Sequence, residues 1–574
     1  MKMSDLGAVA AERATEEAAL LEIESRVCSH GDTVHYAENP KIFERCCGSY
    51  LYDLHGRQYL DLQMWYSAVN LGYANPVVVA AMQAQMSQLP QLACQYLHRE
   101  KIELAEMICD SMERAFGMKG RVQFNVGGSQ AIEDALKLVR KNTGRQRMLA
   151  FQGGYHGRTL AASAITSSYR YREAFGEFAD RAEFLPYPYT FRSPYPGDPQ
   201  KTEDYCVREL ERMFEHEYTG AWNPKTGRSE FGAFFIEAIQ GTGGYVIPPR
   251  NYFRRMADIC RRHGILIVDD EIQMGFFRTG KMWALQHFDI QPDIVAFGKA
   301  LTNGMNPISG IWAREDLINP TVFGPGSTHS TFASNTLGTA SGLAVMRIFA
   351  AENYEEKVAE QGAYFLAGLR ALQRKHPEIG DVDGLGLALR MEMCEVDGRT
   401  PNRQLADRMF QLGLEGDLVV GSETIGLVLD IGGYFKNVIT LAPSLEISRA
   451  EIDQGLLALD VVLRRAKETI AAEAGLGADA GMESGSGWRQ RQVSIATGGS
   501  ANIHARCSAP ERNRLPRHRA PDAPGARLLH PVRVRGVPRW PSPAVPWCCF
   551  TACAARRWMC VPSPGRCART DFIR

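Results

Sequence analysis

Apolar and polar positions alternate along the central part of the chain in a way that predicts strands followed by helices. The apolar run 265–268 ends in the acidic segment 269–271, and the run 293–298 ends in Lys299. Short apolar runs bounded by polar residues are typical of buried strands. Strand and helix patterns alternate over about residues 121–345, which predicts a mostly parallel sheet covered by helices on both faces.

A glycine-rich turn precedes one of the predicted helices. The turn contains Gly127, Gly128 and Ser129, and apolar residues at helical spacing follow it from Ile132 to Val139. Small residues let backbone N–H groups approach a phosphate closely, and the helix dipole favours an anion at that end. An ordinary tight turn before a helix is the alternative interpretation.

Lys299 and Asp270 are candidate catalytic residues because each of them follows a predicted strand. Open α/β sheets bind ligands at the C-terminal ends of their strands. An amine can form a Schiff base with the aldehyde of pyridoxal phosphate (PLP), and a carboxylate can keep the pyridine nitrogen protonated. Taken alone, either residue is more simply interpreted as a solvated side chain at a strand end.

Six segments, in this order, give the chain a resemblance to the class III aminotransferases, which are PLP enzymes of fold type I. They are GGSQAIEDALKLVR, GGYHGRT, FFIEAIQGTGG, ILIVDDEIQMGFFRTGKMW, PDIVAFGKALTNGMNPISG and HSTFASNTLG. The resemblance covers roughly residues 45–468 and implies an α/β fold with a large PLP-binding domain at 91–345. Residues 1–90 would form an N-terminal arm and part of a smaller α/β domain. Residues 346–470 would form the rest of that smaller domain. A disordered tail would occupy 471–574.

The resemblance also implies a role for each site residue. Lys299 would form the Schiff base and then carry the proton between substrate and cofactor, and Asp270 would pair with the pyridine nitrogen. Other cofactor contacts would come from Gly128, Ser129, Tyr155, His156, Gln273 and Thr331, and substrate contacts from Trp65, Tyr66, Arg158 and Glu237. Thr331 would reach over from a partner subunit, which implies a homodimer with shared active sites. No metal ion is expected.

Two departures from the family pattern bear on the substrate. Thr242 stands where members that use glutamate commonly carry a glutamate, and Thr440 stands where they carry an arginine. A threonine replaces neither the charge nor the planar fork of a guanidinium that clamps a carboxylate. We therefore expect a keto-acid acceptor and an amino donor whose reacting amine is remote from a carboxylate, or that lacks one. Arg390 lies in a strand pattern and is either paired with Glu392 or another acid, or faces the site.

Three classes of function fit these residues. The leading one is a transaminase that moves an amino group in two half-reactions. A PLP-dependent racemase, epimerase, aminomutase or decarboxylase of the same family would use the same Lys299 and Asp270. A non-catalytic binding protein with a basic tail is the third, and the joint presence of Lys299, Asp270 and Gln273 argues against it.

The C-terminal part of the chain has a different composition. No lysine follows residue 467, and residues 486–574 hold 16 arginines against three acids. Six of the 14 cysteines lie there, without the paired spacing of a usual zinc site. A disordered basic tail that binds acidic surfaces is one interpretation. We favour a reading-frame error in a GC-rich gene, because such codons replace lysine with arginine, proline and alanine.

The length, charge balance and cysteine content of the chain limit the classes of function that fit it. The chain has 574 residues, 45% of them hydrophobic, with 65 basic and 65 acidic side chains, so a large core is possible and binding to nucleic acid or membrane gains no support. No apolar run reaches the ~20 residues that span a bilayer, and residues 1–27 lack a signal-peptide pattern. The other eight cysteines show no disulfide framework, and we expect a cytoplasmic protein.

Overall fold

A seven-stranded sheet contains the strands that the apolar runs predict. Its strand order is β4-β12-β11-β10-β9-β5-β6. The strands span Gly120–Asn125 (β4), Arg147–Phe151 (β5), Glu183–Leu185 (β6), Phe231–Ile236 (β9), Leu266–Asp270 (β10), Ile294–Phe297 (β11) and Ser309–Arg314 (β12). Neighbours from β11 to β6 run parallel, whereas β12 is antiparallel to both β11 and β4. The predicted mostly parallel sheet is confirmed.

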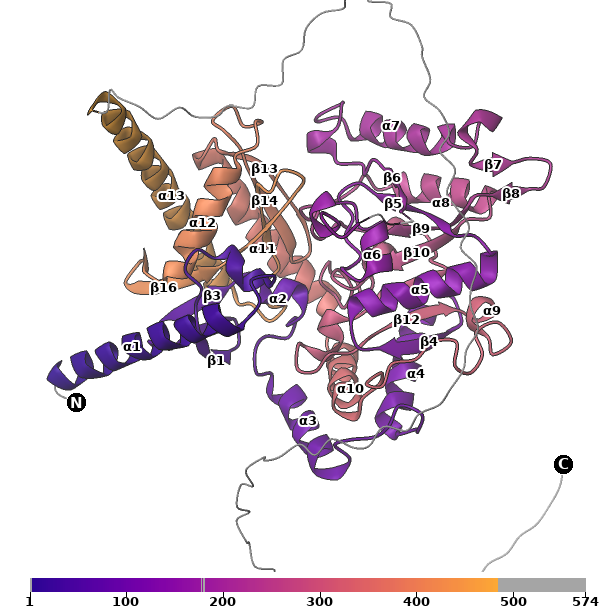
Figure 1. The fold of residues 1–574 in the computed structure, drawn as a ribbon, viewed down its shortest axis with the longest axis horizontal. Coiled ribbons are helices and arrows are strands. Elements are labelled where there is room, and N and C mark those ends of the chain that lie inside the picture. The colour runs from indigo at the N-terminus through magenta and orange to yellow at the C-terminus, as the bar shows by residue number, and fades with distance from the viewer. Residues whose placement is uncertain (1–2, 177, 179–180, 484–574) are drawn as a thin grey trace, which may run out of the picture. The chain divides into compact units, whose positions relative to one another are not determined.

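Helices cover both faces of this sheet (Figure 1). On one face, α5 (Gly128–Thr143) packs Ile132 into an apolar cluster that includes Val268 of β10. On the other face, α8 (Tyr252–Arg262) belongs to the main core, which includes Ile267 of β10. Val268 and Ile267 point to opposite faces because successive strand residues alternate.

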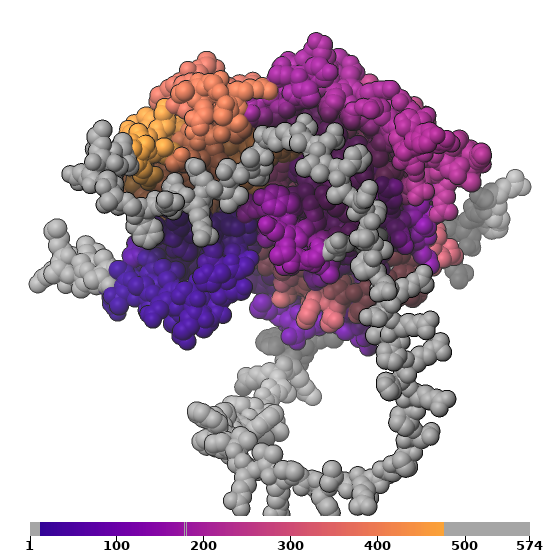
Figure 2. Space-filling model, turned by 45° about the horizontal axis from the view of Figure 1, so that its top comes forward, coloured from indigo at the N-terminus to yellow at the C-terminus, as the bar shows by residue number. Residues whose placement is uncertain are grey.

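The chain forms two further sheets of four or five strands, and the first of them combines strands from both ends of the described chain. The first has the order β1-β2-β3-β16-β15 and the second has the order β13-β14-β18-β17. Their strands span Phe43–Cys47 (β1), Tyr50–Asp53 (β2), Gln58–Asp61 (β3), Ile379–Leu385 (β13), Ala388–Met393 (β14), Leu418–Val420 (β15), Glu423–Val428 (β16), Asp430–Gly432 (β17) and Val438–Leu441 (β18). Because β3 pairs in parallel with β16, indigo N-terminal residues lie beside orange C-terminal residues on the surface in Figure 2.

The remaining elements connect and cover these sheets. A short hairpin is formed by Trp222–Asn223 (β7) and Arg228–Ser229 (β8). The further helices are Met3–Val27 (α1), Met64–Ser67 (α2), Pro76–Gln88 (α3), Arg99–Phe116 (α4), Leu160–Ile165 (α6), Pro199–Arg212 (α7), Glu315–Ile318 (α9), Thr336–Ala351 (α10), Tyr354–Lys375 (α11), Arg403–Glu415 (α12) and Arg449–Glu483 (α13). Among the residues described, every helix is too short or too polar to cross a bilayer.

The computed structural model describes residues 3–176, 178 and 181–483. The interpretations of the tail composition fall on residues outside this set. The predicted tail boundary at residue 471 is wrong, since α13 continues without a break through Glu483; alanines, which have the highest helix propensity, are frequent in this last part. The described residues form one compact unit, and the division of residues 1–470 into a large and a small domain stays a prediction.

Candidate active site

A cavity of about 340 Å³ lies at the C-terminal ends of the large sheet's parallel strands. Most of the predicted site residues line it together: Trp65, Gly128, Ser129, Tyr155, His156, Glu237, Asp270, Gln273 and Lys299. Tyr66, Arg158 and Thr331 are predicted site residues outside this lining. Residues that are up to 234 positions apart in sequence therefore meet where open α/β sheets bind ligands.

Lys299 follows β11 and begins a short 3-10 helix, Lys299–Thr302. Its backbone φ is 40°, in the left-handed region that residues with a Cβ rarely adopt. Burial lowers the pKa of its amine from 10.5 to about 8, although the charges of Asp270, Glu237 and Asp430 oppose this change. A substantial fraction of the amine is consequently neutral and nucleophilic near pH 8.

Asp270 ends β10 and is held by two hydrogen bonds. Its Oδ2 pairs with Nδ1 of His156 at 2.8 Å, and its Oδ1 accepts from the backbone N–H of Ile272 at 3.1 Å. Burial alone would lower the pKa of His156, but the hydrogen bond and the charge of Asp270 outweigh burial and raise it. The pair fixes the orientation of a carboxylate that would otherwise rotate.

Glu237 follows β9 and uses both of its carboxylate oxygens on backbone groups. It accepts from the N–H of Tyr155 and from the N–H of Gly241, each at 2.8 Å. Burial raises the pKa of this carboxyl to about 7, with the charge of His156 acting against the rise and that of Asp270 adding to it. Glu237 thus ties two glycine-rich loops to the cavity, an arrangement that accounts for its burial without a substrate contact.

Two glycines make a close-fitting cradle at the start of α5. A Cβ on Gly128 would lie 3.0 Å from Cδ1 of Ile272, and a Cβ on Gly157 would lie 2.1 Å from Oγ of Ser129. The Ser129 hydroxyl also accepts from the backbone N–H of Arg158 at 3.2 Å. Because the first amides of a helix lack intrahelical partners, this cradle offers donors to an anion.

Ser309 is a lining residue that the sequence did not reveal. It begins β12, its Oγ is buried, and among the described residues this oxygen has no hydrogen-bond partner. A buried hydroxyl of this kind is satisfied by a ligand or by water. The only sequence signal is its place in the PDIVAFGKALTNGMNPISG segment.

Gln273 and Tyr155 also line the cavity. Nε2 of Gln273 donates to the hydroxyl of Tyr245 at 2.9 Å. The Tyr155 ring meets the edge of Tyr171, with ring centroids 5.2 Å apart. Both side chains therefore have protein partners and still line the cavity.

Trp65 and Tyr66 lie on a left-handed turn, α2, in which four consecutive residues have φ between 45° and 66°. Such a conformation costs L-residues about 1–2 kcal/mol each. Buried Asp61 stabilises the turn, because its Oδ1 accepts from the N–H groups of Gln63 (2.7 Å) and Met64 (2.8 Å). Trp65 and Tyr66 remain 54% and 39% exposed, so neither aromatic residue belongs to the core.

Arg158 and Thr331 are both exposed. The Arg158 guanidinium lies 4.7 Å above the Tyr171 ring, next to the lining residue Gly157. Thr331 lies in the loop before α10, and within this chain nothing brings it to the cavity. Its predicted role in a neighbouring subunit stays a prediction.

Asp269 and Glu271 point away from Asp270 toward the other face of β10. Both are fully buried, and Oε1 of Glu271 accepts from the N–H of Leu285 at 2.8 Å. Burial raises the pKa of Asp269, and it raises the pKa of Glu271 to about 7. The charge of Glu271 adds to the rise at Asp269, and neither carboxylate oxygen of Asp269 has a hydrogen-bond partner among the described residues.

The donor set fits a flat aldehyde cofactor that carries a phosphate. The cradle of Gly128 and Ser129 suits the anion, the amine of Lys299 suits the aldehyde, and the Asp270 carboxylate suits a protonated ring nitrogen. The unsatisfied hydroxyl of Ser309 leaves one further donor for such a ligand. These side chains define the cavity of a PLP-type enzyme.

The sequence model of the family Aminotransferase class-III matches residues 33–463, and the chain belongs to this family. It is 32% identical over 425 residues to 5-aminovalerate aminotransferase DavT of Pseudomonas aeruginosa, covering 73% of this chain and 93% of that relative. It is 29% identical over 456 residues to an alanine/serine racemase of Pyrococcus horikoshii, and the match covers 79% of this chain and 91% of that relative.

Solved structures agree with the sequence relatives. A PLP-bound amine transaminase from an uncultivated Pseudomonas species superposes with a TM-score of 0.68 at 27% identity, covering 77% of this chain and 98% of that chain. The predicted family, fold class, aminotransferase activity and PLP cofactor are thereby confirmed. The predicted roles of individual residues stay predictions.

Proposed function

We propose that the protein transfers an amino group from an amine or an ω-amino acid to a keto acid, in two half-reactions at the cavity of Lys299. The observation that supports this best is the placing of Lys299, Asp270 and the Gly128–Ser129 cradle around one cavity. PLP, when bound, supplies an electron sink that stabilises negative charge on the substrate carbon.

Each residue has a definite task in this proposal. Nζ of Lys299 holds the cofactor and then moves a proton, for which a pKa of about 8 suits work near neutral pH. Asp270 keeps the ring nitrogen protonated, and His156 orients the Asp270 carboxylate. Gly128 and Ser129 would hold the phosphate, and Tyr155 and Gln273 would hold the ring.

The absence of an arginine at residue 440 favours donors without an α-carboxylate. Thr440 instead donates its hydroxyl to Oδ2 of Asp430 at 2.7 Å. Arg390, one strand away in register with Thr440, is bound to Asp381 and Tyr189. It therefore cannot substitute for the missing arginine.

A racemase is the second candidate, because a racemase is among the relatives and would use the same Lys299. Product analysis separates the two activities. A transaminase converts its donor to a keto or aldehyde product over many turnovers only when a keto-acid acceptor is supplied, whereas a racemase inverts a chiral amino acid over many turnovers without an acceptor. The panel should contain 5-aminovalerate, a plain amine, alanine and glutamate, with pyruvate and 2-oxoglutarate as acceptors.

We also propose a cytoplasmic homodimer. Thr331 is exposed on the loop before α10, and in such a dimer its hydroxyl would contribute to a neighbouring subunit's phosphate cradle. The described cysteines are all free, as suits a reducing compartment. Loss of cofactor affinity in a Thr331→Ala variant that remains a dimer is expected, and a fully active monomer would contradict the shared site.

A further inference from the structure

The loop that carries Thr331 is joined to the phosphate cradle of its own chain through one buried carboxylate. Thr331 is exposed in this loop, residues 327–333, which precedes α10. The hydroxyl of Thr328, three residues before Thr331, donates a hydrogen bond to Oδ1 of Asp134. Asp134 lies on α5, the helix that begins at Gly128 in the cradle. The loop is therefore anchored to the helix that forms the anion site.

Asp134 is also connected to the wall of the Lys299 cavity. Its Oδ2 accepts a hydrogen bond from Nδ2 of Asn125 at 2.9 Å, and Oδ1 of Asn125 accepts from the backbone N–H of Val126 at 3.0 Å. Asn125 ends β4, and Val126 lines the cavity. Three hydrogen bonds in series thus join the Thr328 loop to a residue of the cavity wall.

Burial leaves the Asp134 carboxylate few alternatives to these partners. Asp134 is 3% exposed and Asn125 is 6% exposed. Burial raises the pKa of the Asp134 carboxyl, and the hydrogen bonds from Thr328 and Asn125 oppose that rise. Because a buried carboxylate without hydrogen-bond donors is strongly unfavourable, the fold holds Thr328 and Asn125 at fixed positions around it.

Few other side-chain contacts hold the loop. Among the described residues, the side chains of residues 327–333 make one further polar contact with the rest of the chain, between Nδ1 of His329 and Sγ of Cys94 at 3.6 Å. A thiol is a weak hydrogen-bonding group, and His329 is exposed. The position of Thr331 consequently depends mainly on the bond between Thr328 and Asp134.

We propose that Asp134 is a positioning residue for the cofactor phosphate of a neighbouring subunit. By fixing Thr328, it holds the loop so that the Thr331 hydroxyl reaches the neighbouring phosphate cradle. This inference rests on the proposed homodimer. In that dimer each chain has one such link between its own cavity and the loop that serves the other cavity. Asp134 itself touches neither cofactor nor substrate.

The affinity for PLP tests this inference without any turnover, in full-length protein that dialysis has freed of cofactor. Asp134→Ala should raise the Kd for PLP about tenfold, because the phosphate loses a well-placed donor. Pyridoxal, which lacks the phosphate, should bind wild type and variant within about twofold of each other. An unchanged Kd for PLP, or an equal loss for pyridoxal, would overturn the inference.

Asp134→Asn should restore most of the affinity. An amide oxygen still accepts from Asn125, and an amide N–H can donate to the Thr328 hydroxyl. Thr328→Val removes the same link from the loop side, so it should raise the Kd for PLP as much as Asp134→Ala does. A Thr328→Val protein that binds PLP like wild type would contradict the proposed link, even if Asp134→Ala does not fold.

A double variant shows whether Asp134 acts through Thr331. Asp134→Ala combined with Thr331→Ala should bind PLP no more weakly than Thr331→Ala alone, because both changes remove one contact. Additive losses would overturn the inference and leave the shared site standing. Wild-type affinity in Thr331→Ala would overturn the shared site and the inference together.

Asp460→Ala is the matched control for a loss of stability. Asp460 is a carboxylate that is 9% exposed, accepts from Nζ of Lys375 at 2.7 Å and contacts Nε2 of His376 at 2.6 Å. It lies on α13 and does not line the cavity. Its replacement should lower the Tm and leave the Kd for PLP unchanged. An equal rise of the Kd in Asp460→Ala and Asp134→Ala would mean that general destabilisation weakens binding, and would overturn the inference.

Discussion

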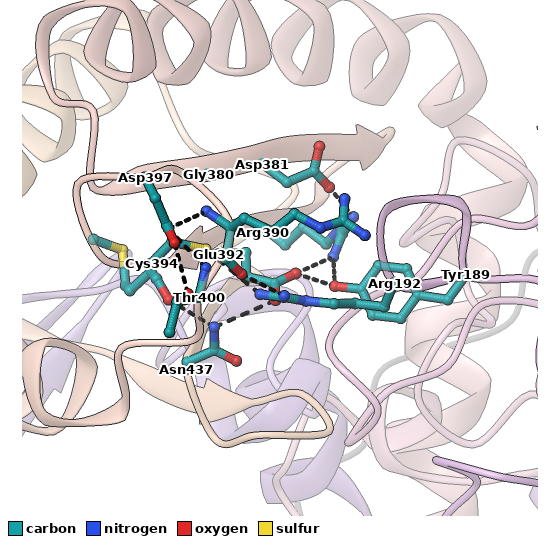
Figure 3. A network of polar contacts seen from close by, with 12 residues as sticks. Tyr189, Arg192, Gly380, Asp381, Arg390, Glu392, Cys394, Asp397, Thr400 and Asn437 are labelled. Atoms are coloured by element: carbon teal, nitrogen blue, oxygen red, sulfur yellow. Dashed lines mark hydrogen bonds and ion pairs between the residues drawn. The ribbon is translucent and has the colours of Figure 1, made fainter. Parts of the chain in front are cut away.

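Two groups of buried charges lie in this protein, and they are satisfied to different degrees. The first is the Arg390 network, formed by Tyr189, Arg192, Asp381, Arg390 and Glu392 (Figure 3). In it Arg390 binds Asp381 and Tyr189, and Nε of Arg192 donates to Oε1 of Glu392 at 2.6 Å. The second group surrounds the cavity of Lys299, whose buried amine feels the charges of Asp270, Glu237 and Asp430 but forms no ion pair with any residue that the structure describes.

The difference distinguishes a structural role from a chemical one. In the Arg390 network nearly every charge has a close opposite charge, so the group offers no free charge to a ligand, and removal of one partner would leave another charge uncompensated. Around Lys299, burial without pairing lowers the pKa of the amine to about 8 and raises that of Glu237 to about 7. Groups whose charge can change near neutral pH are suited to proton transfer.

The largest expected effect is on catalysis. Lys299→Ala should reduce turnover by at least about 10³-fold, because it removes both the cofactor attachment and the proton carrier. Steady-state rates with 5-aminovalerate and 2-oxoglutarate measure this, with circular dichroism to show that the fold persists. Lys281→Ala is the control, since Lys281 is half-buried, pairs with Glu355 and does not line the cavity. Retained turnover in Lys299→Ala would contradict the chemical role.

Breaking the Arg390 network should affect stability instead. Arg390 is only 2% exposed, and Arg390→Leu leaves the half-buried Asp381 carboxylate without its guanidinium partner and buried Glu392 with Arg192 alone. The free energy of unfolding should fall by about 3–5 kcal/mol, while kcat per folded molecule stays near that of wild type. Denaturant unfolding provides the measurement.

Arg347→Leu is the matched control for this change. Arg347 is 62% exposed at its side chain and pairs with Glu103 at 2.7 Å. Removal of such a surface pair should cost about 1 kcal/mol or less. Equal losses for Arg347→Leu and Arg390→Leu would remove the distinction between the network and an ordinary surface pair.

The lowered pKa of Lys299 predicts a pH dependence in the cofactor-free protein. The unfolded chain holds this proton up to pH 10.5, whereas the folded chain releases it at about pH 8. Between those values the unfolded state binds more protons, so stability rises with pH through this window. Lys299→Met should be more stable than wild type below pH 8, and the difference should shrink toward pH 10.5. A difference that is constant with pH would show that the amine titrates normally.

The smallest expected effect is at Thr440, which lies between the two groups. Thr440→Val keeps the side-chain shape but removes the hydrogen bond to Asp430. The free energy of unfolding should fall by about 1 kcal/mol, with little change in turnover of butylamine. Thermal unfolding measures the loss, and a fall of several kcal/mol would place Thr440 inside the Arg390 network.

The strand-end residues of the site could be predicted from the sequence. Lys299 and Asp270 each follow a short apolar run, and parallel strands bring such residues to one edge of the sheet. The phosphate cradle at Gly128 was predictable for a similar reason, because glycine and a helix pattern adjoin there. These signals are local, so a single sequence contains them.

Other parts of the site depend on contacts between distant segments. The antiparallel direction of β12, which places Ser309 in the lining, depends on its pairing with β4 and β11. The left-handed α2 turn is held by Asp61 from the preceding strand, and nothing in its composition predicts four positive φ angles. Asp430 lies beside Thr440 only because β17 pairs with β18. Periodicity and propensity do not record such tertiary constraints.

The most direct test of the account is to reduce the purified, PLP-loaded protein with borohydride and map its peptides by mass spectrometry. The account predicts the reduced cofactor on the peptide that contains Lys299, attached at Nζ, and on no other lysine. A label on a different lysine, or a protein that takes up PLP without any covalent label, would contradict it.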